Sequence, residues 1–226
     1  MPHRQDFFKK PYLLFSAIFI SHACSHKITP YDSGPAARQK EIKETFQPIL
    51  DFMNYKPGMS FADVGAGSGS VTVSMSTLMD NSIVYIQDID SLILNQKNIN
   101  KLIAYYSKQH GRNLRDKITF QKVIGTATQT NLPNFTFDLI YSNGTVHSFS
   151  SLDSIAIDLR KKLKPSGLLF FRDSFKTVKE NYCIKCKKRL LSTDDFLAIM
   201  KKYGFKLEKQ LPDIRGYPIF GFSLAN

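Results

Sequence analysis

The chain has 226 residues, of which 42% are hydrophobic and 22% charged; this ordinary composition excludes a disordered chain and suits one α/β domain with a full core. Three cysteines exclude a disulfide-dense scaffold. The net charge of +12 includes two clusters that could hold nucleic acid or anionic lipid, although a solvated lysine-rich surface is the simpler interpretation: Arg160, Lys161, Lys162 and Lys164, then Lys185, Lys187, Lys188 and Arg189.

The N terminus has the pattern of an export signal. Basic residues precede an apolar run over residues 11–20, which is shorter than the roughly 20 residues that span a bilayer. The junction of Ala23 and Cys24 resembles the cleavage and lipidation site of a bacterial lipoprotein. We therefore expect residues 1–32 to be a targeting segment and linker, with membrane anchoring at Cys24, and residues 33–226 to form one domain. An uncleaved membrane-surface segment, or a buried N-terminal helix in a cytoplasmic protein, is the alternative.

The next segment predicts a helix followed by a strand. Apolar residues recur at helical spacing from Ile42 to Met53, with Pro48 inside the pattern, which predicts a kink or two shorter helices. A turn over residues 56–59 then leads to a short apolar strand at residues 61–64.

A glycine-rich turn follows this strand directly, at Gly65, Gly67 and Gly69. Such a turn lets the backbone approach a ligand closely. A dinucleotide fingerprint needs its third glycine one residue later, where Ser70 stands, so NAD is disfavoured, and the lysine of a phosphate-binding P-loop is missing. Asp63, at the end of a strand that should be buried, needs a cationic or hydrogen-bonding partner.

These residues carry a resemblance to a known family. The sequence Asp63-Val-Gly-Ala-Gly-Ser-Gly69 resembles the first motif of class I methyltransferases that depend on S-adenosylmethionine (SAM). The resemblance implies that the glycine loop holds the methionine part of SAM with the acid nearby, which assigns Asp63, Gly65, Ala66, Gly67 and Gly69 to the cofactor. Another nucleotide-binding protein, or a purely structural turn, is the alternative.

The second half of the cofactor site is expected after the next strand. A helix over residues 71–79 leads to a β-branched and aromatic strand over residues 83–87, which ends at Asp88. Asp88 follows Gly65 by 23 residues, close to the separation expected for an acid that accepts hydrogen bonds from ribose hydroxyls. We assign Asp88 and the adjacent Ile89 to the cofactor and Asp90 to the cap of the next helix; a cap is also the alternative role for Asp88.

The third strand leads to the expected adenine contact. A helix runs from Leu92 to about His110, and residues 118–124 form the strand. In the family that the chain resembles, an acid soon after this strand often binds the adenine amino group. Here the segment has no acid, so Thr126, or else Gln129, is the expected contact.

The fourth strand opens onto the expected acceptor side. It covers residues 137–143, and loops at the carboxyl ends of central strands line the active site of a doubly wound sheet. We assign Asn143 to the cofactor. His147, in the following loop, is the candidate for orienting or deprotonating the acceptor, with a structural histidine as the alternative.

The remaining elements complete the resemblance. A helix over residues 152–163 and a turn at residues 164–167 precede a buried strand at residues 168–171. Cys183 and Cys186 lack the other ligands of a structural zinc site; a disulfide in an exported protein, or a reactive thiol site, is the alternative. A helix capped at Ser192 and two strands, over residues 205–211 and 218–224, close the chain.

We therefore expect an α/β fold with a doubly wound, seven-stranded, mostly parallel sheet and a C-terminal antiparallel hairpin. The resemblance implies methyl transfer from SAM to a small-molecule or lipid-like acceptor, without a metal. Two rivals are a non-catalytic binding protein with this fold at the membrane surface and a basic RNA methyltransferase. The RNA interpretation is favoured if both lysine clusters lie on one face.

Overall fold

The computed structural model describes residues 39–178, 180–183, 187–211 and 217–225. The predicted targeting segment, including Cys24, lies outside these residues, as do Lys185 and Cys186 of the late cysteine and lysine cluster.

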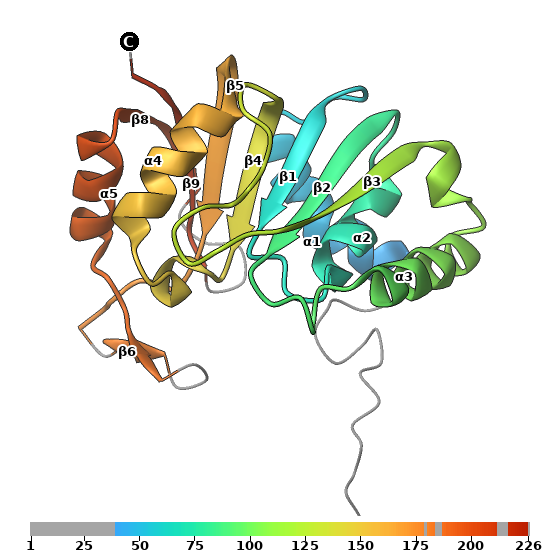
Figure 1. The fold of residues 1–226 in the computed structure, drawn as a ribbon, viewed down its shortest axis with the longest axis horizontal. Helices are drawn as coiled ribbons and strands as arrows, with labels where there is room; N and C mark the ends of the chain where they lie inside the picture. Colours follow the sequence, from blue (N-terminus) through green and yellow to red (C-terminus); the bar gives the residue numbers. More distant parts are fainter. Residues whose placement is uncertain (1–38, 179, 184–186, 212–216, 226) are drawn as a thin grey trace, which may run out of the picture.

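The described chain is built on one sheet of seven strands (Figure 1). The order β3-β2-β1-β4-β5-β9-β8 is parallel from β3 through β5, and β9 runs antiparallel between β5 and β8. The predicted fold, including the C-terminal hairpin, is confirmed. The strands are β1 (Ser60–Val64), β2 (Ser82–Asp88), β3 (Ile118–Ile124), β4 (Phe137–Asn143), β5 (Leu163–Arg172), β8 (Phe205–Leu211) and β9 (Ile219–Leu224).

Helices cover the two faces of the sheet unequally, as Figure 1 shows. One face packs against α1 (Gln39–Phe52), α2 (Ser70–Met75) with the 3-10 turn η1 (Ser76–Leu78), and α3 (Gln96–Gln109). The other packs against α4 (Leu152–Lys162) and α5 (Thr193–Lys202). Shorter elements are the 3-10 turns η2 (Leu114–Asp116) and η3 (Val146–Ser148) and a hairpin of β6 (Tyr182–Cys183) and β7 (Lys188–Arg189).

Strand β1 lies inside the sheet, between β2 and β4, and both of its faces are buried. Phe61 packs into the core under α1 to α3, whereas Ala62 and Val64 pack into the core under α4 and α5. Alternation of side chains along a strand produces this division. The two cores fix the carboxyl end of β1, where the glycine loop begins.

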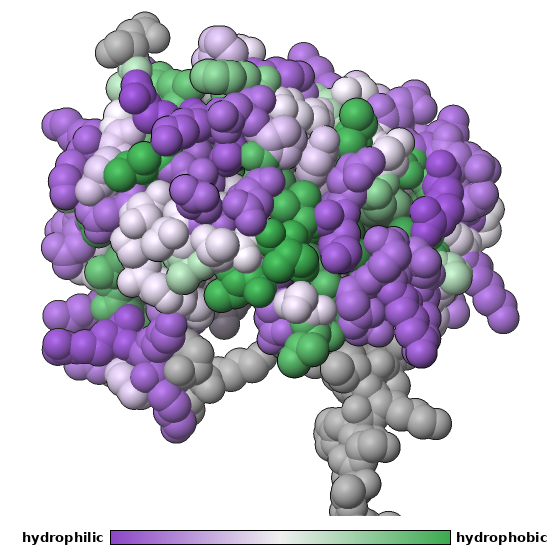
Figure 2. Space-filling model, in the orientation of Figure 1, coloured by the Kyte–Doolittle hydropathy of each residue, from purple (hydrophilic) through white to green (hydrophobic). Residues whose placement is uncertain are grey.

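The connection between β3 and β4 contains no helix. Residues 125–136 cross the sheet as an extended loop, so part of the face of β2 lacks a covering layer, and Ile83 is 44% exposed. Figure 2 shows apolar side chains in the middle of this face of the molecule, in front of β1 and β2 of Figure 1. The start of this loop, directly after β3, lies at the carboxyl ends of the parallel strands.

Four local expectations need correction. Helix α1 is one helix with Pro48 inside it, so the two shorter helices do not form, and the kink stays a prediction. The helix expected over residues 71–79 ends at Met75 and continues as η1. Strand β5 begins at Leu163, because the expected turn at residues 164–167 is taken up as an irregularity in its pairing with β4. Asp90 caps the turn before α3, whereas Asn95 caps the helix itself.

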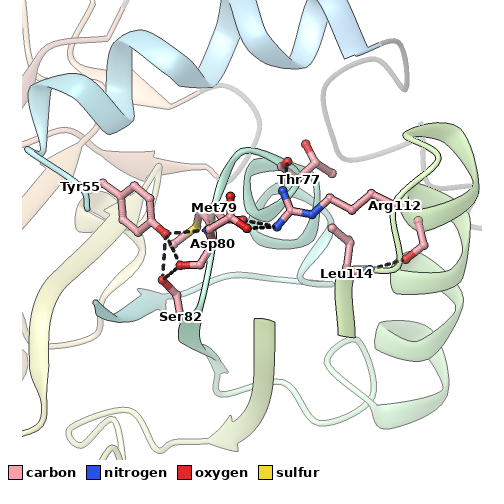
Figure 3. Close-up of polar contacts among 8 residues, drawn as sticks. Tyr55, Thr77, Met79, Asp80, Ser82, Arg112 and Leu114 are labelled. Carbon is pink, nitrogen blue, oxygen red and sulfur yellow. Dashed lines mark hydrogen bonds and ion pairs between the residues drawn. The ribbon is translucent and has the colours of Figure 1, made fainter. Parts of the chain in front are cut away.

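A polar network fixes the amino end of β2 (Figure 3). The Tyr55 hydroxyl lies 2.8 Å from Ser82 Oγ and accepts a 2.8 Å hydrogen bond from the Asp80 amide. Arg112 donates from Nη2 to Asp80 Oδ1 at 3.0 Å and to the Met79 carbonyl at 2.5 Å. These bonds join the ends of α1, η1 and α3 at the amino ends of the parallel strands, opposite the glycine loop.

The edge strands and most of the described residues of the two basic clusters are exposed, but Lys162 is buried, at 7%. The edge strands β3 and β8 carry exposed lysines, at Lys122 and Lys206. The cluster at residues 160–164 lies where α4 ends and β5 begins, at the amino edge of the parallel strands, whereas β7 lies against η3 at the carboxyl edge. The two lysine clusters therefore do not share an edge. No helix among the described residues is long and apolar enough to cross a membrane.

Candidate functional site

The glycine loop is held against strand β2 by its backbone. The amides of Gly65 and Ala66 both donate to the Gln87 carbonyl at 2.9 Å. Gly65 has φ +75°, and a Cβ there would lie 2.4 Å from the Thr145 methyl group, so only glycine fits between β1 and the loop after β4. Gly67 has φ +57° and open space around its Cα. The backbone is therefore closely packed at Gly65, whereas there is room for a ligand beside Gly67.

Asp88 connects the glycine loop to the end of β2. Its Oδ2 accepts a 2.7 Å hydrogen bond from the Gly67 amide, and its Oδ1 accepts a 2.9 Å bond from the Asp90 amide. A carboxylate has about four acceptor positions on its two oxygens. Two positions therefore remain for the hydroxyl groups of a ligand, and Asp88 lies on the cavity wall described below.

Asp63 is a buried acid beneath the glycine loop. Its Oδ2 accepts a 2.6 Å hydrogen bond from Thr72 Oγ1, which comes from α2. Burial raises the pKa of Asp63 to about 7; the Thr72 bond opposes this increase and the nearby charge of Asp88 adds to it. A cation close to this position would favour the charged form of the carboxyl group.

A cavity of about 510 Å³ opens at the carboxyl ends of β1, β2, β3 and β4. Four of the residues assigned to the cofactor line it: Gly65, Asp88, Ile89 and Thr126. Much of the rest of the wall is apolar, with Val64, Ile93, Phe149 and Ile155. The other predicted site residues belong to the elements around the cavity but are not part of its lining: Asp63, Ala66, Gly67, Gly69, Asn143 and the acceptor-side candidate His147. A pocket of this size and mixed lining suits a nucleoside-sized ligand.

The loop after β3 separates the two candidates for the adenine contact. Thr126 lies on the cavity wall, and its Oγ1 accepts a 3.1 Å bond from the Gln129 amide. Gln129 instead lines a smaller hollow against α4. The loop is anchored by Thr130, whose amide and hydroxyl both donate to Asp158 Oδ2, at 2.8 and 2.6 Å. The structure therefore favours Thr126 over Gln129.

The loop after β4 is joined to β1 and β5. Ser142 Oγ donates to the Val64 carbonyl at 2.9 Å and also contacts Thr145 Oγ1. Asn143 Oδ1 accepts a 3.0 Å bond from Arg172 Nη1, which places Asn143 between β4 and β5. In this arrangement the Asn143 side chain is used by Arg172, and its assignment to the cofactor stays a prediction.

His147 is paired with a buried acid that the sequence did not single out. His147 Nδ1 lies 2.6 Å from Asp173 Oδ1, and the histidine side chain is 10% exposed. Asp173 is fully buried, and its Oδ2 accepts a 2.6 Å bond from the Val146 amide. Burial raises the pKa of Asp173, whereas His147 and the backbone amides of Val146 and Ser174 lower it. Because an ionised carboxylate only accepts, this contact places a proton of His147 on Nδ1.

The β6–β7 hairpin lies beside the same loop. Lys188 Nζ donates a 2.8 Å bond to the carbonyl of Ser148, a residue of the cavity wall. Cys183 is in β6, but Cys186 lies outside the described residues, so the disulfide and the thiol site stay predictions. Within the described part of the chain, no three His, Cys, Asp or Glu side chains are grouped so that they could hold a metal ion.

Several contributors to the site were missed from the sequence. Thr130, Ser148, Phe149 and Ser150 come from loops whose sequence shows no motif. Asp173 did have a signal, because it follows a strand buried on both faces, where a carboxyl group needs a partner.

Known proteins share both the sequence pattern and the fold. A family model described as "Methyltransferase domain" matches residues 62–171. Phosphoethanolamine N-methyltransferase 3 of Arabidopsis thaliana is 26% identical over 174 residues, which are 77% of this chain and 30% of that protein. Sterol 24-C-methyltransferase of Pneumocystis carinii is 33% identical over 114 residues, 50% of this chain and 27% of that protein. The chain thus spans less than a third of these relatives.

Solved structures share the fold at low identity. A SAM-dependent methyltransferase from Aquifex aeolicus is 20% identical, with a TM-score of 0.58 over 80% of this chain and 89% of that one. The [4+2]-cyclase SpnF is 12% identical, with a TM-score of 0.59 over 83% of each chain. The cyclase shows that this fold also occurs in a protein named for another reaction. The family match over residues 62–171, the motif at β1 and the sheet order agree: the chain contains a methyltransferase domain with the fold of class I SAM-dependent methyltransferases.

Proposed function

We propose that this chain transfers the methyl group of SAM to a small-molecule acceptor. The observation that carries the proposal is the cavity at the carboxyl ends of β1 to β4, where the glycine loop and Asp88 meet. SAM supplies an activated methyl group on a sulfonium, so the protein's share of the reaction is mainly alignment and exclusion of water.

The proposed cofactor contacts divide along the strand ends. Asp88 accepts the ribose hydroxyls with its two remaining acceptor positions, and Ile89 and Thr126 bound the adenine. The open space at Gly67 admits the methionine part close to the backbone. Asp63 lies below it as an acid whose charged form is favoured by a cationic ligand.

The acceptor side is proposed to be built around His147. With Nδ1–H held by Asp173, Nε2 is the nitrogen of His147 that can accept a proton, and the histidine lies in the loop between the cavity-wall residues Thr145 and Ser148. Transfer of a methyl cation to a nucleophile that bears hydrogen leaves a proton to be removed. His147 is therefore the proposed base, and Asp173 positions it without touching the acceptor.

The acceptor class follows from two kinds of relative. Two of the relatives are named for phosphoethanolamine, an amine, and for a sterol, which is methylated at carbon. Both are small molecules, and this coarser class is what we propose for the chain. An RNA acceptor is disfavoured because the two lysine clusters lie at opposite edges of the sheet.

The test is methyl transfer from isotopically labelled SAM with the purified full chain. Phosphoethanolamine and a sterol are offered as separate acceptors, and formation of S-adenosylhomocysteine is followed. Label in either acceptor supports the proposal, and His147→Ala should abolish most of it. A chain that binds SAM but labels no acceptor in a broad small-molecule panel would instead favour the non-catalytic rival.

The cellular location is a separate proposal. We propose that residues 1–23 are removed and that Cys24 is lipidated, on the basis of the basic start, the apolar run and the Ala23–Cys24 junction. Such an anchor would place the domain at a membrane surface, and a cytoplasmic enzyme with an uncleaved segment is the rival.

A further inference from the structure

A second concave surface lies at the amino ends of the parallel strands, on the opposite side of the sheet from the cofactor cavity. It is an open groove of about 590 Å³, which we call the basic groove, and its walls include Phe135, Ile157, Arg160, Lys161, Lys202 and Leu224. Phe135 precedes β4, Arg160 and Lys161 end α4, and Leu224 ends the antiparallel strand β9. All of these positions lie at the amino edge of the parallel strands, so the groove is separate from the site described above.

Phe135, on the wall of the basic groove, has an unfavourable backbone conformation and an exposed side chain. Its φ is +52°, in the left-handed region that non-glycine residues rarely adopt, and its side chain is 70% exposed. The strained turn is held by two backbone bonds to the end of α4, from the amide of Phe135 to the Lys161 carbonyl and from the amide of Thr136 to the Lys162 carbonyl, each 2.9 Å. Strain maintained in this way often marks a functional position. Here it presents an aromatic ring to solvent.

The charge of the groove is positive. Arg160 lies against the backbone of Gly204 at the groove wall, and Lys161 is exposed beside Phe135. The neighbouring cations at residues 162 and 164 are directed elsewhere: Lys162 pairs with Asp158 at 3.3 Å and Lys164 with Asp138 at 2.8 Å. Lys202 shares Asp153 with the Tyr203 hydroxyl. The groove thus joins Arg160 and Lys161 to apolar surface at Phe135 and to Ile157, which is 44% exposed.

We propose that the basic groove docks on the surface of a bilayer that contains anionic phospholipid. An aromatic ring and aliphatic side chains next to arginine and lysine match an interface with apolar chains below negative headgroups. A second copy of the chain is a poor match, because a two-fold contact would bring the same basic side chains together. Docking through this edge leaves the cofactor cavity, at the opposite edge, facing away from the membrane.

The chain contains no tryptophan, which allows a local test in the full-length protein. Phe135→Trp places a single indole in the groove, and Leu92→Trp places one at an 86% exposed position after β2, at the other edge of the sheet. Each variant is titrated with vesicles of phosphatidylcholine mixed with phosphatidylglycerol and with vesicles of phosphatidylcholine alone. We expect a blue shift of emission for Phe135→Trp with the anionic vesicles only, and no shift for Leu92→Trp. Because the signal is local, binding through the N terminus does not produce it.

Charge variants in the Phe135→Trp background test the electrostatic part. Replacing both Arg160 and Lys161 by glutamine should weaken vesicle binding about 30-fold, which corresponds to about 1 kcal/mol for each basic residue. Matched changes of the exposed Lys97 and Lys101 on α3 to glutamine should alter it less than twofold, since screening confines the effect to nearby charges. Unchanged binding of S-adenosylhomocysteine shows that each variant is folded.

Three results would overturn the proposal. The first is an emission of Phe135→Trp that does not respond to anionic vesicles, or that responds equally to neutral ones. The second is a shift caused by an RNA oligonucleotide in place of the vesicles, which would assign the groove to nucleic acid. The third is a shift that depends on protein concentration alone, which would assign it to a contact between copies of the chain.

Discussion

Replacing Asp88 by asparagine tests the cofactor site most directly. The change keeps the shape of the side chain but removes its charge and turns one acceptor oxygen into an amide group. Each oxygen of Asp88 now accepts a backbone N–H, from Gly67 or from Asp90. Whichever way the asparagine is turned, its NH₂ group faces one of these donors. The variant therefore loses part of the loop's support as well as a charged acceptor for ribose.

The expected size follows from the number of acceptor positions. A hydrogen bond to a charged group is worth about 1.5–3 kcal/mol, so one lost ribose bond weakens binding at least about tenfold. Loss of both bonds extends this to about 10⁴-fold. Calorimetric titration of the full chain with SAM and with S-adenosylhomocysteine measures the change without knowledge of the acceptor.

Asp116→Asn is the matched control, because Asp116 is an exposed acid in η2 that bonds to Asn113. It should leave cofactor affinity unchanged. If Asp88→Asn is folded and binds S-adenosylhomocysteine within twofold of the wild type, the assignment of Asp88 to ribose is wrong. Wild-type protein that fails to bind at millimolar cofactor would refute the whole account of the cavity.

Three further predictions concern other parts of the chain. His147→Ala should lower turnover about 10²–10⁴-fold, as expected for loss of a general base, with cofactor affinity nearly unchanged; an unaffected rate would make His147 structural. Asp63→Asn should change the free energy of unfolding only at high pH. The pKa of Asp63 is about 7 in the folded state and 3.8 ordinarily, so the folded wild type binds the extra proton between these values and loses stability as the pH rises from about 4 to 7. Urea unfolding without cofactor should show the variant to be more stable at pH 8, by a difference on the order of 4 kcal/mol, and similar at pH 4; equal pH dependence of the two proteins would contradict the burial argument. Cys24→Ser should release the protein from membranes, and an intact mass that still includes Met1 on the extracted wild type would exclude cleavage before Cys24.

The fold could be predicted from the sequence because its strands are short and strongly patterned. The expected ranges for β3, β4 and β8 agree with the structure, since apolar runs bounded by turn residues leave few alternatives. The start of β5 could not be predicted. Its residues Lys164–Gly167 have turn chemistry, yet they are held in the strand by irregular pairing with β4.

The site was only partly predictable, because some of its contacts join residues that are far apart in the sequence. Gly65 follows β1 and Asp88 is the last residue of β2, and they come together because β1 and β2 are paired. His147 and Asp173 are 26 residues apart, and their contact depends on the register of β4 against β5, which local patterns do not specify. The choice of Thr126 over Gln129 likewise depended on how the loop crosses the sheet.

The lysines on the two outer strands limit how the sheet can grow. Strands β3 and β8 each offer unpaired backbone groups along one side, which in other proteins permit aggregation by strand addition. A copy that joined through β8 would have to accommodate the exposed charges of Lys206 and Glu208, and one that joined through β3 the exposed charge of Lys122. Charged side chains on edge strands oppose such additions. Replacing them with threonine or valine would remove that protection and make the chain more prone to form insoluble stacks during expression at high concentration.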